Sequence, residues 1–563
     1  MLETRLASTP TFGSIITESP TNGVQTPPAA SGAARKSSET TPPVTPVFTR
    51  WAVAPVSPHV PAQPKPRWPR RAVVLAPRPA RPPVPHRASC AMAGDPEKDP
   101  TTMPRPIFST DHKSTARYLD LAANAHGREK GFLMLEALRR TQNAKPHIVE
   151  IGPGGGASVE FLSSQIGGYA RAEQNVALTL IEAPGVESSS LASAISLFRS
   201  VGSCELVHGF AQDIHNLLPC AVDIISTSAL FHEVYSYGGG YSGLHAIMRT
   251  LPTVLVPGGF FAYRDVYAVD SGTLHRRVTQ CYEARSWLQF IRMFLPYYLE
   301  HGTHPYHHAD DEIVVRQNSR IVDASKLDTS GECAFISAPL GLFREIQRHY
   351  ITFRDHVWRS GTLGFTPALE GQLSNDWIDL RTGHKRVHYT LCDAEWLTTA
   401  QKTMLRAMSE PYDDHHTIDG DIFDNVTDVA LTAFLDAAND GDTGCTQVWK
   451  DWRAREGHET YAYLTLDELL CAFAENSVQA ATEQPAVLMP VQANDVRRIE
   501  RHYYNRFLSK RLPNPLLDAK QLVLFRNIPL TEVDTLTEAL ETLQGLCAKE
   551  SLARVYEAVN RRG

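Results

Sequence analysis

The clearest chemical signal in the chain is a glycine-rich segment that follows a short apolar run. Residues 147–157 are His-Ile-Val-Glu-Ile-Gly-Pro-Gly-Gly-Gly-Ala, with an acid at Glu150 and four glycines within five positions. Glycine lets a backbone turn sharply and lets a ligand approach without a Cβ in the way. The pattern predicts a strand, a tight turn and a helix, an arrangement that binds nucleotide-like ligands at the edge of an open α/β sheet.

Two classes of cofactor fit this turn. Gly152, Gly154 and Ala157 match the G-x-G-x-x-A spacing of dinucleotide-binding enzymes, so a nicotinamide or flavin cofactor stays open on the loop alone. Glu150 favours a cationic ligand, because a carboxylate would repel a pyrophosphate placed near it. S-adenosylmethionine carries a sulfonium and an ammonium, and it therefore suits an acid at this position better.

Four further apolar runs are predicted to be strands of the same sheet. The first of them ends in Glu182, where a carboxylate can accept hydrogen bonds from two ribose hydroxyls. Phe210 follows the next run and is placed to pack on a purine, and Ser228 ends the run after that. The four runs span residues 175–182, 204–208, 221–228 and 254–265.

The five segments between residues 147 and 265, in this order, resemble class I S-adenosylmethionine-dependent methyltransferases. Residues 150–156 are similar to motif I of that family, and the Pro-Gly-Gly turn at 257–259 before an apolar strand is typical of it. The resemblance implies a Rossmann-like α/β fold, with a mostly parallel sheet and an antiparallel closing strand, and S-adenosyl-L-methionine as cofactor. It also implies that an acid at the position of Asp213 hydrogen-bonds the adenine amino group. The predicted cofactor-binding residues are Glu150, Gly152, Gly154, Gly156, Glu182, Phe210, Asp213 and Ser228.

His232 is the predicted catalytic residue, since it follows the fourth strand at the crevice toward which the S-methyl group would point. The ordinary pKa of a histidine suits a general base near neutrality, and Glu233 is expected to orient the ring. The alternative is that His232 packs at the sheet edge and only contacts the cofactor. The predicted substrate contacts are Tyr235, Tyr237, Arg264 and Asp265, of which Arg264 suits a carboxylate or a phosphate.

Methyl transfer from a sulfonium requires no metal, and no metal site is predicted. Two His-rich segments, 301–311 and 413–424, contain metal-ligand residue types, but neither matches a known ligand spacing. Pro305 disfavours a helix interior between His304 and His308. Both segments are expected to be solvated loops. The nine cysteines form no C-x-x-C pair, which fits a reducing compartment.

Two segments, 344–359 and 497–511, interleave basic and aromatic residues. Such stripes can hold phosphates and stack bases, so an RNA or nucleotide methyltransferase is an alternative. On amphipathic helices the same pattern is more often a solvated face with buried rings, which is the interpretation we favour. After residue 100 the chain has 43 Lys and Arg against 56 Asp and Glu, and this net charge of −13 opposes a general nucleic-acid surface.

The composition also predicts the domain boundaries. Residues 1–103 hold more than half of the 38 prolines and are predicted to be a disordered Pro/Arg-rich arm, with organelle targeting as the weaker alternative. Residues 104–270 are the predicted methyltransferase core, and a helix at 114–140 is expected to cap its cofactor crevice. Residues 271–455 are predicted to be a large, mainly helical insertion or lid, with helices at 280–299, 340–359 and 394–408.

The rest of the chain is predicted to complete the core. Residues 456–530 are expected to supply a closing helix at 463–473 and closing strands at 486–489 and 521–525. Residues 531–563 have the apolar periodicity of one or two amphipathic helices. No apolar run reaches the roughly 18 residues that a membrane span needs, so a soluble, cytoplasmic protein without a membrane partner is expected.

The function predicted from these features is methyl transfer from S-adenosyl-L-methionine to O, N or C of a small organic acceptor. An RNA acceptor is the weaker alternative. A catalytically inactive binding protein that keeps the same fold is an alternative from a different class. No oligomeric state is predicted.

Overall fold

The fold was analysed in a computed structural model of the chain. It describes residues 127–169, 175–265, 269, 274–303, 305, 313–330, 333–359, 361–368, 378–379, 386–392 and 396–562. The predicted N-terminal arm and the first part of the predicted helix at 114–140 lie outside the described residues.

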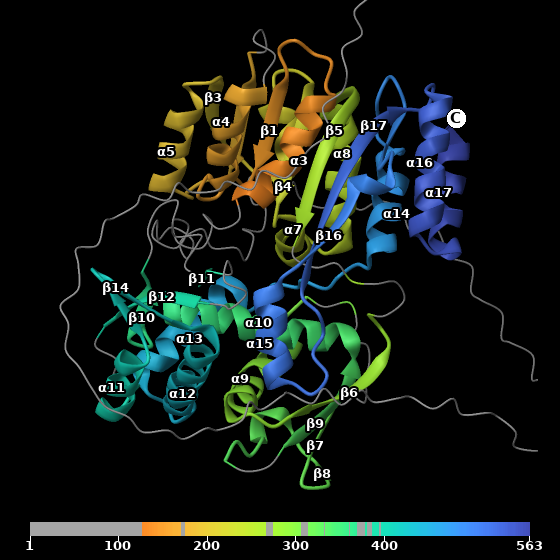
Figure 1. Cartoon of the computed structure of the whole chain (residues 1–563). Helices are drawn as coiled ribbons and strands as arrows, with labels where there is room; N and C mark the ends of the chain where they lie inside the picture. The colour runs from red at the N-terminus through yellow and green to blue at the C-terminus, as the bar shows by residue number, and fades with distance from the viewer. Residues whose placement is uncertain are drawn as a thin grey trace, which may run out of the picture. The chain divides into compact units, whose positions relative to one another are not determined.

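An eight-stranded sheet organises the part of the chain that carries the glycine-rich loop (Figure 1). Its strand order is β15-β17-β5-β4-β1-β2-β3, with β16 also paired to β17. The strands β1 to β5 pair with one another in parallel. The strand β17 runs antiparallel to β5, β15 and β16. The strands are β1 (His147–Ile151), β2 (Ala177–Glu182), β3 (Ser203–His208), β4 (Val222–Ser228), β5 (Leu255–Asp265), β15 (Ala486–Met489), β16 (Val496–Glu500) and β17 (Ala519–Pro529).

This arrangement confirms the predicted fold class, a Rossmann-like, mostly parallel sheet with an antiparallel closing strand. The chain moves outward from β1 to β2 and β3 on one side, and from β4 to β5 on the other. The strand order therefore reverses between β1 and β4, and ligands of open α/β sheets bind at such a switch point.

Helices cover both faces of the sheet because buried side chains alternate along its strands. Ile148 packs on one face with α3 (Gly127–Arg140), α4 (Ala157–Tyr169) and α5 (Ser189–Phe198). Val149 packs on the opposite face. That second layer contains α6 (Ile214–Leu217), α7 (Phe231–Tyr237), α8 (Tyr241–Val254), α14 (Leu466–Ser477), α16 (Val533–Leu546) and α17 (Lys549–Arg562).

The segment between β5 and α14 contains more β-structure than predicted. Its helices are α9 (Arg285–His301), α10 (Leu340–Arg359), α11 (Thr399–Ala407), α12 (Gly420–Asn439) and α13 (Thr443–Glu456). One small sheet has the order β6-β9-β7-β8, formed by Arg277–Tyr282, Ala334–Pro339, Val314–Gln317 and Arg320–Ile321. A second has the order β10-β12-β14-β13 with β11 on β12, formed by Phe365–Pro367, Arg386–Leu391, His415–Asp419, Glu410–Tyr412 and Ile378–Asp379.

Two predictions of helix are wrong in part. Gln280 was expected to begin a helix, but it lies in β6, because its segment pairs with β9 along six residues. Residues 497–500 were expected to be helical, but they belong to β16, which pairs with β17. In both cases pairing with a distant strand determined the local conformation, which helical periodicity alone does not reveal.

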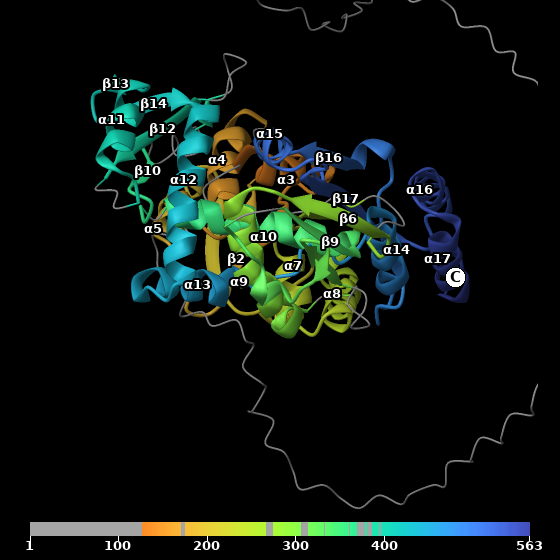
Figure 2. The same ribbon diagram turned by 90° about the horizontal axis from the view of Figure 1, so that it is seen from below.

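The segment between β5 and α14 has a hydrophobic core of its own, and the helix α10 lies at its centre. It contacts α9, α12 and α13 (Figure 2). Its Tyr350 ring stacks on Trp287 with ring centroids 3.7 Å apart. The helix α15 (His502–Arg511) connects β16 to β17, yet its Tyr504 and Phe507 are buried in this same core. Among the described helices, none is long and apolar enough to cross a membrane.

Candidate cofactor and acceptor site

The glycine-rich loop after β1 adopts a backbone that only glycine takes readily. Gly152, Gly154 and Gly156 have φ angles of +70°, +55° and +78°. A Cβ on Gly156 would lie 2.8 Å from the Cβ of Ala194, so α4 and α5 leave no room there. A Cβ on Gly152 would meet nothing nearer than Leu230 at 3.9 Å, so conformation and not packing demands glycine there.

Glu182 is hydrogen-bonded to this loop, and Glu150 is hydrogen-bonded to the helix that follows it. The backbone N–H of Gly154 donates to Oε2 of Glu182 at 3.0 Å, and the N–H of Ala183 donates to Oε1 at 2.9 Å. Glu150 is 1% exposed, and its Oε1 accepts a hydrogen bond from the Ser158 hydroxyl. Its Oε2 is buried without a hydrogen-bond partner. A buried carboxylate oxygen without a donor is costly, so this atom is suited to receive one from a ligand.

The electrostatics of Glu150 depend on α3. Burial raises the pKa of Glu150 to about 7, although the Ser158 hydrogen bond and the charge of Lys130 lower it. Burial likewise lowers the pKa of Lys130, in the first turn of α3, to about 8. This end of α3 packs closely on α4, where a Cβ on Gly127 would lie 2.4 Å from the carbonyl oxygen of Ala157. The described part of the predicted capping helix thus brings a lysine to the predicted cofactor crevice.

The other predicted cofactor residues follow the neighbouring strands. The last residue of β3 pairs with Glu182. Phe210 and Asp213, both half-buried, come directly after β3, around a single turn at Ala211–Asp213. Ser228 is the last residue of β4, and its hydroxyl accepts a hydrogen bond from Arg264 at 2.8 Å. The predicted residues therefore lie at the carboxyl ends of four adjacent strands, and their role in binding remains a prediction.

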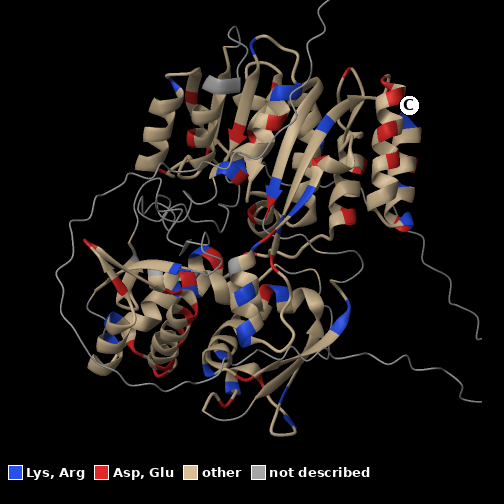
Figure 3. Cartoon of the chain, viewed as in Figure 1, with Lys and Arg blue, Asp and Glu red and all other residues tan. Residues whose placement is uncertain are grey.

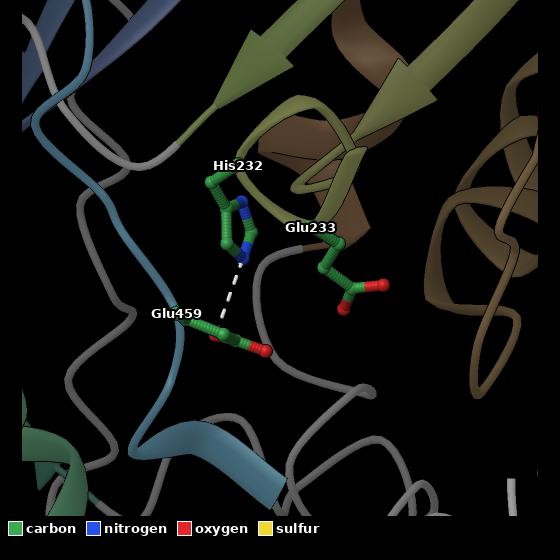
Figure 4. Close-up of side chains that lie close together, drawn as sticks. All are labelled: His232, Glu233 and Glu459. Carbon is green, nitrogen blue, oxygen red and sulfur yellow. Dashed lines mark ion pairs between the residues drawn. The ribbon is translucent and has the colours of Figure 1, made fainter. Parts of the chain in front are cut away.

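A second group of polar side chains surrounds His232, at the start of α7. Its Nδ1 lies 2.8 Å from Oδ1 of Asp265, and its backbone N–H donates to Oδ2 of the same carboxylate at 3.1 Å. Its Nε2 faces Oε2 of Glu459 at 3.5 Å (Figure 4). His232 and Glu459 are buried, whereas Glu233 is half-buried. The imidazole is thus held between two carboxylates.

This arrangement changes the argument for His232 as a base. Burial alone would lower the pKa of His232, but the charges and hydrogen bonds of Asp265 and Glu459 raise the pKa well above its ordinary value. The two carboxylates therefore favour the doubly protonated ring over the neutral ring. The expectation that His232 acts with an ordinary histidine pKa is wrong, because that expectation left Asp265 and Glu459 out.

Glu459 and Tyr461 were not predicted from the sequence. The Tyr461 hydroxyl donates to Oε2 of Glu459 at 2.8 Å, and the Tyr461 ring lies 5.1 Å from the His232 ring. Two backbone N–H groups, of Tyr461 and Ala462, donate to one oxygen of the buried Glu345 at 2.9 and 2.7 Å. The segment lies between α13 and α14, and no local pattern in it signals proximity to His232.

The predicted substrate contacts fall into two groups. Tyr235 is buried and stacks on Tyr463 with ring centroids 4.9 Å apart, and the Tyr237 hydroxyl donates to the carbonyl oxygen of Arg455 at 3.3 Å. Arg264 is 4% exposed and makes two hydrogen bonds to Oε1 of Glu129, at 2.8 and 2.6 Å. These three side chains already have partners inside the protein, and Asp265 is bonded to His232.

A small pocket adjoins Asp265 and was not predicted. It is lined by Tyr263, Asp265, Tyr461, Tyr463, Leu464, Thr465, Leu466, Leu469 and Gln521. Gln521 is opposite Asp265 in the pairing of β17 with β5. The pocket combines aromatic walls with polar groups, and it lies beside the pair of His232 and Asp265.

The two basic and aromatic stripes differ in exposure, because α10 is largely buried whereas the basic side chains Arg506 and Lys510 of α15 are exposed. In α10 the side chains of Arg344, His349 and Arg354 are buried, and Arg354 pairs with Asp424 at 2.7 Å. In α15 Arg506 pairs with Asp421 at 2.9 Å. Figure 3 shows Lys and Arg in this region interspersed with Asp and Glu. The stripe of α10 is therefore not available as a surface, and α15 has the favoured arrangement of a solvated basic face with its rings Tyr504 and Phe507 buried.

The prediction that both His-rich segments are solvated loops is wrong for the described one, because His415–Asp419 forms β14, which pairs with β12, and Gly420 begins α12. Most of segment 301–311 lies outside the described residues. In segment 413–424, His415 pairs with Asp414 and Asp419 caps the N-terminus of α12. Within the described chain, the search for three mutually close metal-ligand residues found His232, Glu233 and Glu459 and neither His-rich segment.

Comparisons with known proteins add structural matches only. Searches against protein-family models and against curated proteins gave no match. The chain is similar in structure to the glycopeptide N-methyltransferase MtfA complexed with S-adenosyl-L-methionine, at 18% identity and a TM-score of 0.19, over 28% of this chain and 62% of that one. It is also similar to the N-methyltransferase NodS from Bradyrhizobium japonicum WM9, at 13% identity and a TM-score of 0.19, over 37% of this chain and 93% of that one.

A third match is an O-methyltransferase family protein from Burkholderia thailandensis, at 10% identity and a TM-score of 0.23, over 41% of this chain and 61% of that one. The chain thus corresponds to about three fifths of the length of two of these three structures. At such scores the fold assignment rests on the strand order and pairing described above. The chain has a Rossmann-like sheet with an antiparallel closing strand.

Proposed function

We propose that this protein is an S-adenosyl-L-methionine-dependent methyltransferase that acts on a small organic acceptor. The observation that carries the proposal is the buried Oε2 of Glu150, which has no donor and lies beside a glycine loop at the switch point of the sheet. An ammonium would give this oxygen the hydrogen-bond donor that it lacks, and a sulfonium nearby would add positive charge to that of Lys130. The two N-methyltransferases and the O-methyltransferase family protein among the structural matches are consistent with this chemistry.

The residues present fit the cofactor. The glycine loop leaves space for a ligand near Gly152, and Glu182 is placed to accept hydrogen bonds from ribose hydroxyls in exchange for the N–H of Gly154. Asp213 and Phe210 are assigned to the adenine, by hydrogen bonding and by packing. When bound, the cofactor would supply a methyl group on a sulfonium, which leaves the protein to position the acceptor and hold its proton.

The acceptor is assigned to the side of His232. Asp265, His232 and Glu459 form a connected polar network there, and aromatic side chains line the small pocket beside Asp265. We keep His232 and Glu233 as the proposed catalytic residues, although Asp265, and not Glu233, makes the contact with Nδ1 that orients the ring.

Calorimetric titration with S-adenosylmethionine tests the cofactor assignment. The unmodified protein should bind one equivalent, and Gly154→Arg should abolish binding because a long side chain would fill the loop. Gly545→Arg is the matched control, since a Cβ on Gly545 meets nothing within 4 Å. Absence of binding to the unmodified protein, or a preference for NAD in the same titration, contradicts the proposal.

Turnover separates the enzyme from an inactive binding protein of the same fold. Cofactor labelled in the S-methyl group should transfer label to at least one member of a panel of small hydroxyl, amine and carbon acceptors. Cofactor binding without transfer across the panel favours the inactive alternative. Label transferred to RNA and not to small acceptors favours the nucleic-acid alternative.

A further inference from the structure

The cluster around His232 has the composition and spacing of a metal site. One ring nitrogen of His232 and one carboxylate oxygen each of Glu233 and Glu459 all lie within 4.8 Å of one another (Figure 4). Two ligands that each lie about 2.1 Å from a shared ion are roughly 3.0–3.4 Å apart. The separation of 3.5 Å between Nε2 of His232 and Oε2 of Glu459 is close to that value.

Asp265 is a second, independent feature of such a site. A histidine that binds a metal usually donates its other ring N–H to a carboxylate, which fixes the tautomer and the ring orientation. Asp265 makes this contact with Nδ1 at 2.8 Å and also holds the backbone N–H of His232. When an ion replaces the proton on Nε2, Nδ1 keeps its proton for Asp265 and Nε2 faces the ion on the side of Glu459.

The opposite side of the cluster is held as firmly. The Tyr461 hydroxyl donates to the oxygen of Glu459 that faces His232. The backbone of Tyr461 is fixed by Glu345, and Thr460 donates its N–H to the hydroxyl of Ser236 on α7 at 2.7 Å. Residues far apart in sequence are therefore locked in place around one point, as a preformed ligand set requires.

We propose that His232, Glu233 and Glu459 bind one divalent transition-metal ion such as Mn²⁺ or Zn²⁺, with Asp265 as the hydrogen-bond partner of the histidine ligand. An imidazole nitrogen favours these ions over Mg²⁺ and Ca²⁺, which prefer oxygen ligands. The two carboxylates of Glu233 and Glu459 balance the double positive charge of the ion. This assignment departs from the expectation, drawn from the sequence, that no metal is bound.

Glu233 is half-buried whereas His232 and Glu459 are buried, so part of Glu233 is exposed to solvent. We assign the remaining coordination positions to water or to an oxygen atom of an acceptor. Binding of the ion does not depend on the proposed methyl transfer, and it can be measured without cofactor.

The test is titration of the full chain, free of any affinity tag and of S-adenosylmethionine, with Mn²⁺ and Zn²⁺. Calorimetry and the electron spin resonance of free Mn²⁺ should report one ion per chain. Asp265→Asn should weaken binding by about 10–100-fold, the usual effect of removing the partner of a histidine ligand. Glu459→Gln and Glu233→Gln should weaken it more, because each removes a ligand.

Glu456→Gln is the matched control. Glu456 lies 3.3 Å from the Tyr461 hydroxyl but is not a member of the ligand group, so its variant should bind the ion as the unmodified protein does. The ion should raise the melting temperature of the unmodified protein and of this control but not that of Glu459→Gln. Binding of Co²⁺ to the unmodified protein gives a readout that needs no variant, through the strong visible absorption of an ion with four or five ligands.

Three results would overturn the inference. The first is the absence of saturable one-site binding together with the weak Co²⁺ spectrum of a hydrated ion. The second is undiminished binding in both Glu459→Gln and Glu233→Gln. The third is loss of binding when His304 and His308 of the His-rich segment are replaced by alanine. A protein that binds S-adenosylmethionine but no metal would overturn this inference and leave the proposed function standing.

Discussion

The glycine loop after β1 and the cluster around His232 are built in opposite ways. The loop takes its groups from a continuous stretch and the next strand, and it leaves Oε2 of Glu150 without a partner. The cluster takes its groups from α7, β5 and the segment after α13, and it links them through close polar contacts. The difference indicates that the loop is shaped to receive a ligand, whereas the cluster is held in place by contacts across the fold.

The largest expected effect comes from breaking the loop. Gly156→Val should destabilise the protein by about 2–5 kcal/mol, because a branched side chain at φ of +78° is strained and its Cβ would collide with Ala194. It should also abolish binding of S-adenosylmethionine. Chemical denaturation and calorimetry measure both effects. Gly545→Val, at an open position of α16, is the control and should retain cofactor binding.

The cluster should respond to loss of a single hydroxyl. Tyr461→Phe should cost about 1.5–3 kcal/mol, because it removes a buried hydrogen bond to the charged Glu459. Tyr263→Phe removes only a contact of 3.5 Å with the Tyr463 hydroxyl and should cost less than about 1 kcal/mol. Equal losses of stability in denaturation experiments would show that the cluster is no better ordered than its surroundings.

The pH dependence of cofactor binding should distinguish the two regions. A cationic ligand binds better to ionised Glu150, whose pKa is about 7, so affinity should rise about tenfold from pH 6 to pH 8. The other titratable groups at this carboxylate are Lys130 and Glu182. Calorimetry at several pH values measures the effect, and Glu150→Gln should flatten the profile. A rise that persists in this variant would assign the dependence elsewhere.

The smallest effect is expected at Asp213. Asp213→Asn keeps the size of the side chain and one acceptor oxygen, so the loss of cofactor affinity should be about three- to tenfold, the value of one hydrogen bond. Competition between S-adenosylmethionine and 5′-methylthioadenosine, in which both molecules carry the adenine, should show equal losses for the two. A loss confined to S-adenosylmethionine would place Asp213 away from the adenine.

The sequence predicted what depends on neighbouring residues. The strand, turn and helix around Gly154 follow from local conformational preference, and the strands ending in Glu182 and Ser228 follow from continuous apolar runs. The carboxyl ends of these parallel strands lie at the same edge of the sheet. The position of His232, which follows one of them, was therefore also predictable. Whether these residues bind cofactor or catalyse transfer remains a prediction.

What the sequence did not predict depends on distant contacts. Glu459 reaches His232 only because Glu345 and Ser236 hold its segment, and neither contact has a local signature. The strand β16 forms because β17 offers an edge, although its residues Val-Arg-Arg-Ile-Glu are mostly charged. The two small sheets of the insertion were likewise not recognised, because their short strands alternate with helices.

The placement of α15 has a consequence for the mechanics of the molecule. This helix belongs by connectivity to the closing hairpin of the large sheet, but its rings are anchored among those of α10 and its neighbours. The segment between β5 and α14 is thus attached to the large sheet through the packing of α15, in addition to its own two ends. If the segment between β5 and α14 were removed, the apolar side chains of α15 would be exposed to water. A displacement of this segment would also displace α15 and the strands β16 and β17 that it connects.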